Sequence, residues 1–536
     1  MSNIINEFQH FIDDCVGRIE PLYKEMCESY WQASLTGKEE DAAKAAAMET
    51  RFRKIFSNAG NLSRLKAWRD SGEITEPLLE RQLILLINAH LENQMDAEML
   101  QELVQKQRDI ETAFSTHRPE VHGAKMTDNE IRRILKESTD SHERRRAWEG
   151  SKEVGAHVAA QILELAALRN KVARDLGFEN YYVMALELQE QTEQEVMEIC
   201  RTFEKLSDAP FRKLRREMDA KLAARFGIRP DEMRPWHYED PFFQDAPALE
   251  DADLDPLFAG RNLEEITRDF YEGIGLPVGD ILKRSDLYER EGKNQHAYCI
   301  DVDRNEDVRV LCNIKPSTRW MSTMLHEFGH AVYDKYLDMK LPFLLRTASH
   351  TFTTEAVAML MGRLAQEESW LREVLRVPQE KLSKVAVAAR KQLRTQMLVS
   401  TRWMLVMIHF ERELYRGTGT DLNSLWWDLV EQFQVIRRPE KRDAPDWASK
   451  IHIACFPVYY HNYLWGEFMA SQLRGWIDRE ILPKNNTSIA GHPAVGRYLK
   501  EKIFSPGTGL RWDELLRRST GESLNPEYFV KQFVEV

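Results

Sequence analysis

Long charged stretches of this chain carry apolar residues at the i, i+3, i+4 spacing of an α-helix, and the residue types between them favour helices. This periodicity constrains the fold more than any other feature of the sequence. It predicts helices over 3–34, 38–58, 76–116, 141–175 and 191–226. We therefore predict a mostly α-helical protein.

The pattern changes once, between 286 and 315, where the runs AYCIDV and VRVLCNI favour β-strands and are separated by a polar turn. A small β-sheet is therefore expected there. Because an edge strand can pair with the backbone of an extended peptide, this sheet is also a candidate for substrate binding.

The length of 536 residues exceeds what one hydrophobic core usually organises. We expect residues 1–536 to form a single functional unit of two helical lobes, with a cleft for a ligand between them. Residues 228–261 concentrate proline and acidic residues, which predicts an irregular connection near this point.

Charge and hydropathy exclude several classes of function. The net charge of −12 argues against nucleic-acid binding, which needs a basic surface. No segment approaches the roughly 20 apolar residues that cross a bilayer. The N-terminus lacks the features of a secretion signal. We expect a cytoplasmic protein, and the sequence indicates no particular oligomeric state.

The cysteines agree with this expectation, because they show no C-x-x-C spacing and suit buried reduced thiols better than disulfides or a thiolate metal site. They are Cys15, Cys27, Cys200, Cys299, Cys312 and Cys455.

The stretch TMLHEFGHAVY, residues 323–333, places His326 and His330 one helical turn apart with Glu327 beside them. A catalytic zinc ion takes three protein ligands and leaves one position for water. The next helical stretch, 349–365, carries Glu355 in largely apolar surroundings, where an acid is costly unless it is paired or bound to metal. We predict Glu355 as the third ligand.

With zinc in place, Glu327 could take a proton from water and pass it to a leaving amine, so the site would hydrolyse amides. The alternative on the residues alone is that both histidines are ordinary core residues and Glu355 faces solvent. Further along, residues 446–468 gather Lys450, His452, Tyr459, Tyr460, His461 and Tyr463. That group is either aromatic core packing or a source of donors to an oxyanion.

These motifs together resemble the gluzincin peptidases of the angiotensin-converting enzyme (peptidyl-dipeptidase A) family, and the thimet oligopeptidase and oligoendopeptidase F families are similar too. The resemblance rests on HAYCIDV, HEFGHAVYDKYLDMKLPFLLR, FTTEA, DWASKIH and YHNY, and extends to AWEG at 147–150 and to 163–186. It implies a two-lobed helical ellipsoid with a deep central channel and a small β-sheet beside the zinc site.

The resemblance also implies roles for single residues. His326, His330 and Glu355 would bind one zinc ion, and Glu327 would be the general base. In the upstream strand, His296 would contact substrate beside the scissile bond and the backbone at Ala297 would pair with the peptide.

In the late segment, the same family pattern makes Tyr463 and His452 stabilise the oxyanion. Lys450 and Tyr460 would hold the C-terminal carboxylate of the substrate.

Four features of the converting enzymes are missing from this sequence. Met359 replaces an aspartate that orients a zinc histidine, and Asn462 replaces an arginine that binds chloride. The glutamine that helps to grip the carboxylate has no clear match near Trp236. Gln295 and Asn313 replace the two cysteines of a disulfide.

The expected function is a zinc metallopeptidase that acts on short peptides and releases C-terminal dipeptides. The departures leave open an oligoendopeptidase of the thimet or oligopeptidase F type, and a metallocarboxypeptidase. The Taq carboxypeptidase family is similar around an F-P-x-Y-like run, but its H-E-S-Q motif is absent. The alternative that is not an enzyme is a helical peptide-binding protein with a vestigial site.

Overall fold

The computed structural model describes residues 3–95, 97–121, 123–249, 253–417, 419–484 and 488–534. The chain divides into two compact units, each assembled from distant parts of the sequence. Unit 1 comprises Met1–Gln94, Asp253–Val387 and Trp465–Tyr528. Unit 2 comprises Met95–Ala252, Ala388–Leu464 and Phe529–Val536.

The prediction of a mostly helical protein is confirmed. Four of the five predicted stretches are single helices, namely α1 (Asn3–Thr36), α2 (Glu39–Ile55), α7 (Ser141–Asp175) and α9 (Glu193–Phe226). The stretch 76–116 is instead two helices, α4 (Pro77–Glu92) and α5 (Ala97–Thr116). Asn93 ends α4 because its backbone N–H bonds to the carbonyls of His90 and Leu91, a local cap that the apolar periodicity does not reveal.

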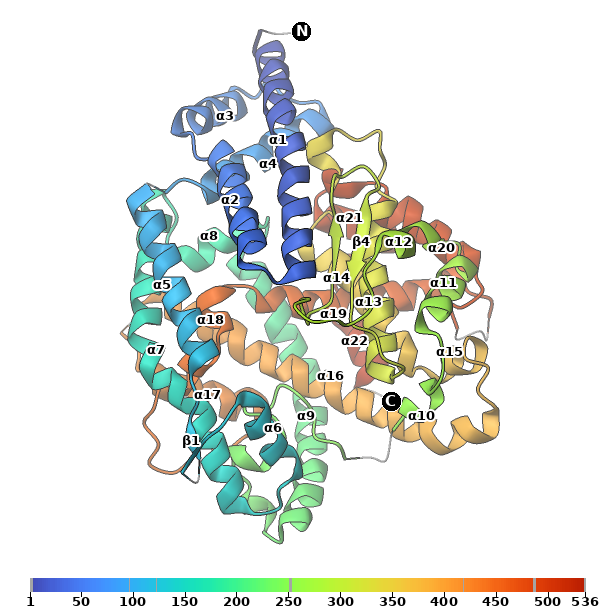
Figure 1. Cartoon of the computed structure of the whole chain (residues 1–536). Helices are drawn as coiled ribbons and strands as arrows, with labels where there is room; N and C mark the ends of the chain where they lie inside the picture. Colours follow the sequence, from blue (N-terminus) through green and yellow to red (C-terminus); the bar gives the residue numbers. More distant parts are fainter. Residues whose placement is uncertain are drawn as a thin grey trace. The chain divides into compact units, whose positions relative to one another are not determined.

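In unit 1, α1 and α2 form an antiparallel pair (Figure 1). Its other α-helices are α3 (Ala59–Ser71), α4, α10 (Asp255–Phe258), α11 (Leu263–Gly273), α12 (Gly279–Arg284), α13 (Thr318–Lys335), α14 (Thr351–Arg363), α15 (Glu368–Glu373), α20 (Pro493–Leu499) and α21 (Trp512–Thr520).

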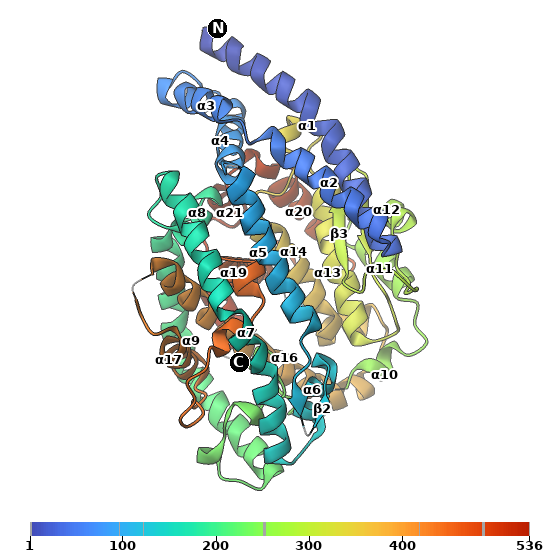
Figure 2. The same ribbon diagram turned by 60° about the vertical axis from the view of Figure 1, so that its left-hand side comes forward.

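In unit 2, α5 runs alongside α7 (Figure 2). Its other α-helices are α6 (Asp128–Glu137), α8 (Tyr181–Leu188), α9, α17 (Leu422–Leu429) and α18 (His452–Cys455). Three helices contain residues of both units. They are α16 (Gln379–Arg416), α19 (Tyr460–Trp476) and α22 (Glu527–Phe533). No helix of the described part of the chain has the length and apolar character needed to cross a membrane.

The small sheet expected before the HEFGH helix is present. Strand β3 (Tyr298–Asp301) pairs antiparallel with β4 (Val308–Leu311), with Tyr298 opposite Leu311. A second hairpin, β1 (Glu120–Val121) with β2 (Ala124–Lys125), was not predicted because strands of two residues carry no periodicity.

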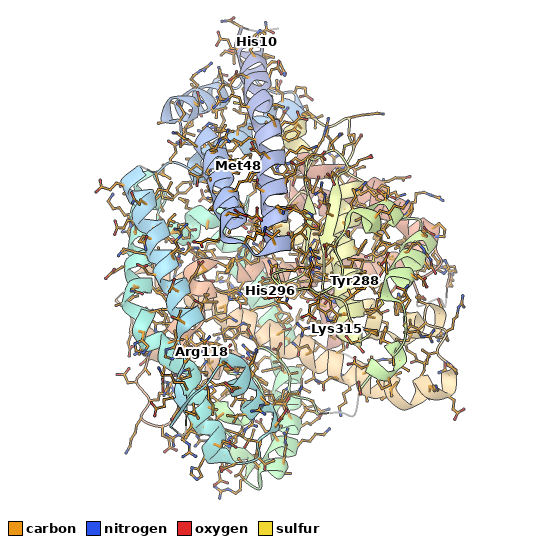
Figure 3. The ribbon with its side chains drawn as sticks, in the orientation of Figure 1. His10, Met48, Arg118, Tyr288, His296 and Lys315 are labelled. Atoms are coloured by element: carbon orange, nitrogen blue, oxygen red, sulfur yellow. The ribbon has the colours of Figure 1, made fainter. Side chains whose placement is uncertain are left out.

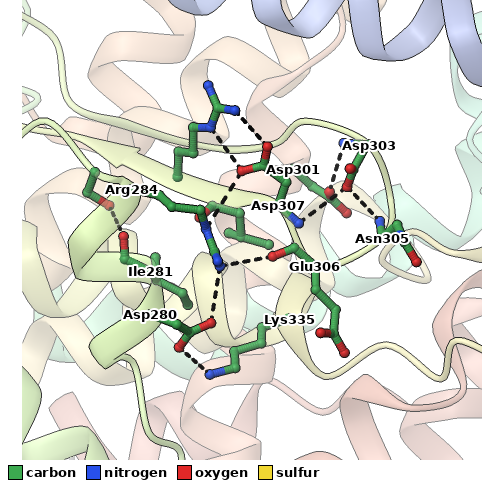
Figure 4. A network of polar contacts seen from close by, with 12 residues as sticks. Asp280, Ile281, Arg284, Asp301, Asp303, Asn305, Glu306, Asp307 and Lys335 are labelled. Carbon is green, nitrogen blue, oxygen red and sulfur yellow. Dashed lines mark hydrogen bonds and ion pairs between the residues drawn. The ribbon is translucent and has the colours of Figure 1, made fainter.

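Polar contacts hold the turn of the β3–β4 hairpin to the neighbouring helices (Figure 4). Arg284 of α12 donates to the backbone carbonyl of Glu306 at 2.9 Å and to Asp280 at 3.1 Å. Lys335 of α13 bonds to the same Asp280 at 2.6 Å. The strands are thereby held beside α13, the helix that carries HEFGH.

Helices α13 and α14 pack closely in unit 1 because glycine occupies their contact. A Cβ built on Gly329 would lie 2.8 Å from Cα of Ala358, a distance that no larger residue could accept without a shift of backbone. Gly329 stands inside the HEFGH motif, so the glycine brings the two histidine-bearing turns against the helix that carries Glu355.

Candidate metal centre and substrate groups

Helices α13 and α14 bring together the three predicted metal ligands. The rings of His326 and His330 lie 5.0 Å apart and nearly perpendicular, at 84°. Glu355 reaches both, with its carboxylate oxygens 3.5 Å from Nε2 of His326 and 3.4 Å from Nε2 of His330. One ligand atom from each residue lies within 4.8 Å of the others. Two imidazoles and one carboxylate at this spacing can hold a metal ion and leave a coordination position free.

Thr354 orients one of the ligands. Its hydroxyl lies 2.8 Å from Nδ1 of His330, so the bond leaves Nε2 of that ring directed at Glu355. The family pattern has an aspartate for a related purpose at the position of Met359, and sequence reasoning did not assign the role to Thr354. The signal in the sequence was the pair Thr353 and Thr354 near the start of α14, immediately before the predicted third ligand.

Replacing Thr354 by valine should lower the affinity for zinc about 10- to 100-fold, the usual cost of removing a partner that orients a metal-bound histidine. Zinc competition with a chelator of known affinity measures the change. The control is Thr351→Val, which makes the same substitution at an exposed position of α14. Equal zinc affinity in both variants would mean that the Thr354 hydroxyl does not support His330.

Glu327 lies next to His326 but points into a buried environment, with 8% of its surface exposed. Burial and the negative charge of Glu355 raise its pKa, while His326 and the backbone N–H of Cys299 lower it, and the net result is a pKa of about 7. A carboxyl group with a pKa near neutrality can both accept and return a proton.

The β3 strand lies beside this acid. In the described part of the chain its sheet contains only β3 and β4, so one edge of β3 pairs with no other strand. Ala297 precedes β3 and is half-buried, whereas His296 is exposed (Figure 3). Where the converting enzymes have a disulfide, Asn313 donates to the carbonyl of Asn294 at 2.9 Å, so hydrogen bonding ties the base of the hairpin. All six cysteines are free.

Unit 2 contains the predicted carboxylate-binding lysine, together with a residue that sequence reasoning missed. Nζ of Lys450 donates to Oε1 of Gln244 at 2.7 Å. Lys450 is 8% exposed, and burial lowers its pKa to about 8. Gln244 is the one glutamine in 228–261, so the sequence offered it as a candidate for the glutamine that had no clear match near Trp236.

The aromatic residues of the late segment form a row of ring contacts. The ring of Tyr460 lies 5.4 Å from His452 and 5.7 Å from Tyr463. Burial and the charge of Lys450 lower the pKa of His452 to about 4, so its imidazole is neutral at neutral pH and keeps one N–H donor. Burial also raises the pKa of Tyr460, which therefore stays a phenol able to donate.

His461 and Asn462 bond elsewhere in unit 2. Nε2 of His461 lies 2.7 Å from Oε1 of Gln191, and Asn462 donates to Oε1 of Gln189 at 2.9 Å. Both are buried and hold α19 to the segment that follows α8.

Two family models match this chain, one over each half. Residues 3–229 match the angiotensin-converting enzyme model, and residues 282–535 match the model for peptidase family M3. Both matches confirm the resemblance that the motifs indicated. The predicted zinc ligands and the predicted carboxylate-binding residues fall within the second match, whereas Gln244 lies outside both matches.

The curated relatives are peptidases of distant sequence. Oligopeptidase A of Salmonella typhimurium and that of Escherichia coli are each 23% identical over 434 residues, which is 69% of this chain and 59% of each relative. Thermostable carboxypeptidase 1 of Pyrococcus furiosus is 23% identical over 247 residues, or 42% of this chain and 49% of that protein. The chain thus spans about three-fifths of the length of the oligopeptidases that it matches.

Proposed function

We propose that this chain, which is related to the gluzincin peptidases through both halves of its sequence, is a zinc metallopeptidase that hydrolyses short peptides. The observation that carries the proposal is the convergence of His326, His330 and Glu355 beside a buried acid with a pKa near neutrality. One zinc ion per chain accounts for the donor set, and the free cysteines suit a cytoplasmic location.

Zinc held by the three ligands would polarise a water molecule and the carbonyl of the scissile bond. Glu327 takes the proton from the attacking water and returns it to the leaving amine. The unpaired edge of β3 holds the substrate backbone in an extended conformation through main-chain hydrogen bonds at Ala297, and His296 contacts the peptide beside the scissile bond. This pairing is largely independent of side chains, which suits an enzyme that accepts many peptides.

Tyr463 and His452 donate to the oxyanion of the tetrahedral intermediate. Contacts within unit 2 support these roles, because the ring of Tyr460 lies against both His452 and Tyr463 and so holds the two donors in one row.

Lys450, Gln244 and Tyr460 bind the C-terminal carboxylate of the substrate, which makes release of a dipeptide the favoured mode of cleavage. The Lys450–Gln244 hydrogen bond supports this mode, because it fixes the ammonium group in a buried place where an anion would be strongly held.

Amidation of the substrate's C-terminus, or Lys450→Ala, should each lower kcat/KM about 10- to 100-fold, the range expected for one charge-assisted contact. Both changes together should cost little more than either alone, because they remove the same interaction. Lys205→Ala, at an exposed position of α9, is the control. Additive losses would place Lys450 outside the carboxylate site.

The preference for a free carboxylate should also depend on pH. Lys450 carries its charge below its pKa of about 8 and loses it above. The ratio of kcat/KM for the free peptide to that for the amidated peptide should therefore fall as the pH rises through about 8. A ratio that stays constant from pH 6 to pH 10 would contradict an ionic grip by this lysine.

A second candidate mode is internal cleavage, as in an oligoendopeptidase. A cavity of about 580 Å³ in unit 2 has Lys450, Arg132 and Phe242 in its wall. It is large enough for further residues of a peptide chain to continue past Lys450. Identification by mass of the fragments from peptides with free and amidated C-termini decides between the modes. Dipeptide products would support release from the C-terminus, and equal cleavage of both peptides at internal bonds would support the oligoendopeptidase mode. Release of single residues would indicate a carboxypeptidase. If the zinc-loaded protein cleaves neither peptide, the proposed function is wrong.

A further inference from the structure

A strained turn joins the two groups of proposed substrate-binding residues in unit 2. It runs from Ala454 in α18, two residues after His452, to Val458, two residues before Tyr460. Val458 adopts a φ of 55°, in the left-handed region that a β-branched side chain strongly disfavours. Its side chain is buried, with 2% of its surface exposed. Such a conformation persists only where the surroundings impose it.

Two buried polar side chains form hydrogen bonds to the ends of this turn. Arg169 of α7 donates through Nη2 to the carbonyl of Ala454 at 2.6 Å. Glu411 of α16 accepts the N–H of Val458 on Oε1 at 2.9 Å. Arg169 is 4% exposed and Glu411 is 1% exposed. Both contacts are to backbone atoms, so they fix the path of the chain whatever side chains the turn carries.

Burying the carboxyl group of Glu411 costs free energy, and the hydrogen bond from the Val458 N–H offsets part of that cost. Burial raises its pKa to about 8, while the Val458 N–H and the positive charge of Arg169 oppose the rise. Arg169 has a further partner on the helix of Glu411, donating to the hydroxyl of Tyr415 at 3.1 Å. Apolar residues in place of buried ionisable groups are often neutral or stabilising, so a gain in stability is a weak explanation for the presence of Arg169 and Glu411 here.

We propose that Glu411 and Arg169 are positioning residues, which hold the turn 454–458 so that His452 on one side and Tyr460 and Tyr463 on the other keep the orientation that the reaction needs. This inference rests on the proposed function of those three residues. Glu411 touches neither substrate nor metal in this role. It acts through the backbone of Val458, and the left-handed residue sets the direction in which α19 begins.

The test measures kcat, KM and zinc content for a peptide that the wild-type protein cleaves. Glu411→Leu keeps the size of the side chain but removes the acceptor. It should lower kcat about 10- to 100-fold, the effect of a misplacement of about 1 Å, with zinc content unchanged. Glu411→Gln keeps an acceptor oxygen and should stay within about threefold of wild type. Glu217→Leu, at an exposed position of α9, is the control.

Rescue separates a positioning role from a merely structural one. Glycine adopts the left-handed conformation without strain. Adding Val458→Gly to Glu411→Leu should therefore restore at least a third of the lost kcat. Arg169→Met removes the hydrogen bond at the other end of the turn, should lower kcat in the same way, and carries the test if Glu411→Leu does not fold. A leucine variant with the wild-type kcat, or glycine without any effect on the leucine variant, would overturn the proposal.

Hydrogen exchange tests the same contact without activity. The amide of Val458 should exchange at least tenfold faster in Glu411→Leu than in the wild type, and at the wild-type rate in Glu411→Gln. If the wild-type protein cleaves no peptide, the proposed function fails, and this measurement still tests the grip on the turn. Equal exchange in all three proteins would mean that Glu411 does not hold Val458.

Discussion

Glu327→Gln should keep one zinc ion per chain and lose about 100- to 10,000-fold in kcat, the usual contribution of a general base. Glutamine has almost the same shape, but its amide can neither take the proton from water nor return it to the leaving amine. The three ligands that hold the metal are untouched. Metal content by atomic emission and turnover of a fluorogenic peptide, measured on the same sample, separate binding of zinc from chemistry.

The stability of this variant gives an independent check. Burial raises the pKa of Glu327 to about 7, so above that pH the metal-free wild type bears a buried carboxylate that the unfolded chain would hydrate. The free energy of unfolding of the metal-free wild type should fall as the pH rises from about 4.5 to about 7, and Glu327→Gln should lack this dependence. Glu272→Gln, on the exposed surface of α11, is the control. Substantial turnover in zinc-loaded Glu327→Gln would remove Glu327 as the base.

The sequence predicted those features that depend on residues close together in the chain. His326 and His330 share a face because they are four residues apart, and Glu355 could be predicted because an acid in an apolar helix needs a partner. β3 and β4 were visible as β-favouring runs beside the motif. In each case a short window of residues contains the whole physical reason.

The parts that it could not predict depend on contacts between distant residues or on single rotamers. Gln244 meets Lys450 across 206 residues of sequence. The Glu411–Val458 bond depends on a backbone dihedral angle that no residue pattern announces for valine. The sequence analysis covered the stretch that contains Thr354, but only the position of the hydroxyl in the structure shows that it forms a hydrogen bond with His330. The break after Glu92 came from a cap that the helical periodicity does not encode.

Glu355→Ala should lose the metal itself. Two histidines without the carboxylate leave the site short of a ligand and remove the only negative charge among the three donors. The affinity for zinc should fall by more than about 100-fold, the upper range for removing a partner that merely orients a ligand. After dialysis the variant should hold almost no zinc and hydrolyse no peptide.

Thermal unfolding tests this loss without relying on activity. An ion that binds only the folded chain stabilises it by mass action, so the wild-type Tm should fall on addition of a chelator and recover with zinc. The Tm of Glu355→Ala should respond to neither, whereas Glu327→Gln should respond as the wild type does. We expect Glu327→Gln to keep the metal and lose turnover, and Glu355→Ala to lose both. This difference would assign Glu327 as the base and Glu355 as a ligand. A fully metallated Glu355→Ala protein would remove Glu355 from the ligand set and leave the convergence of α13 and α14 without its chemical explanation.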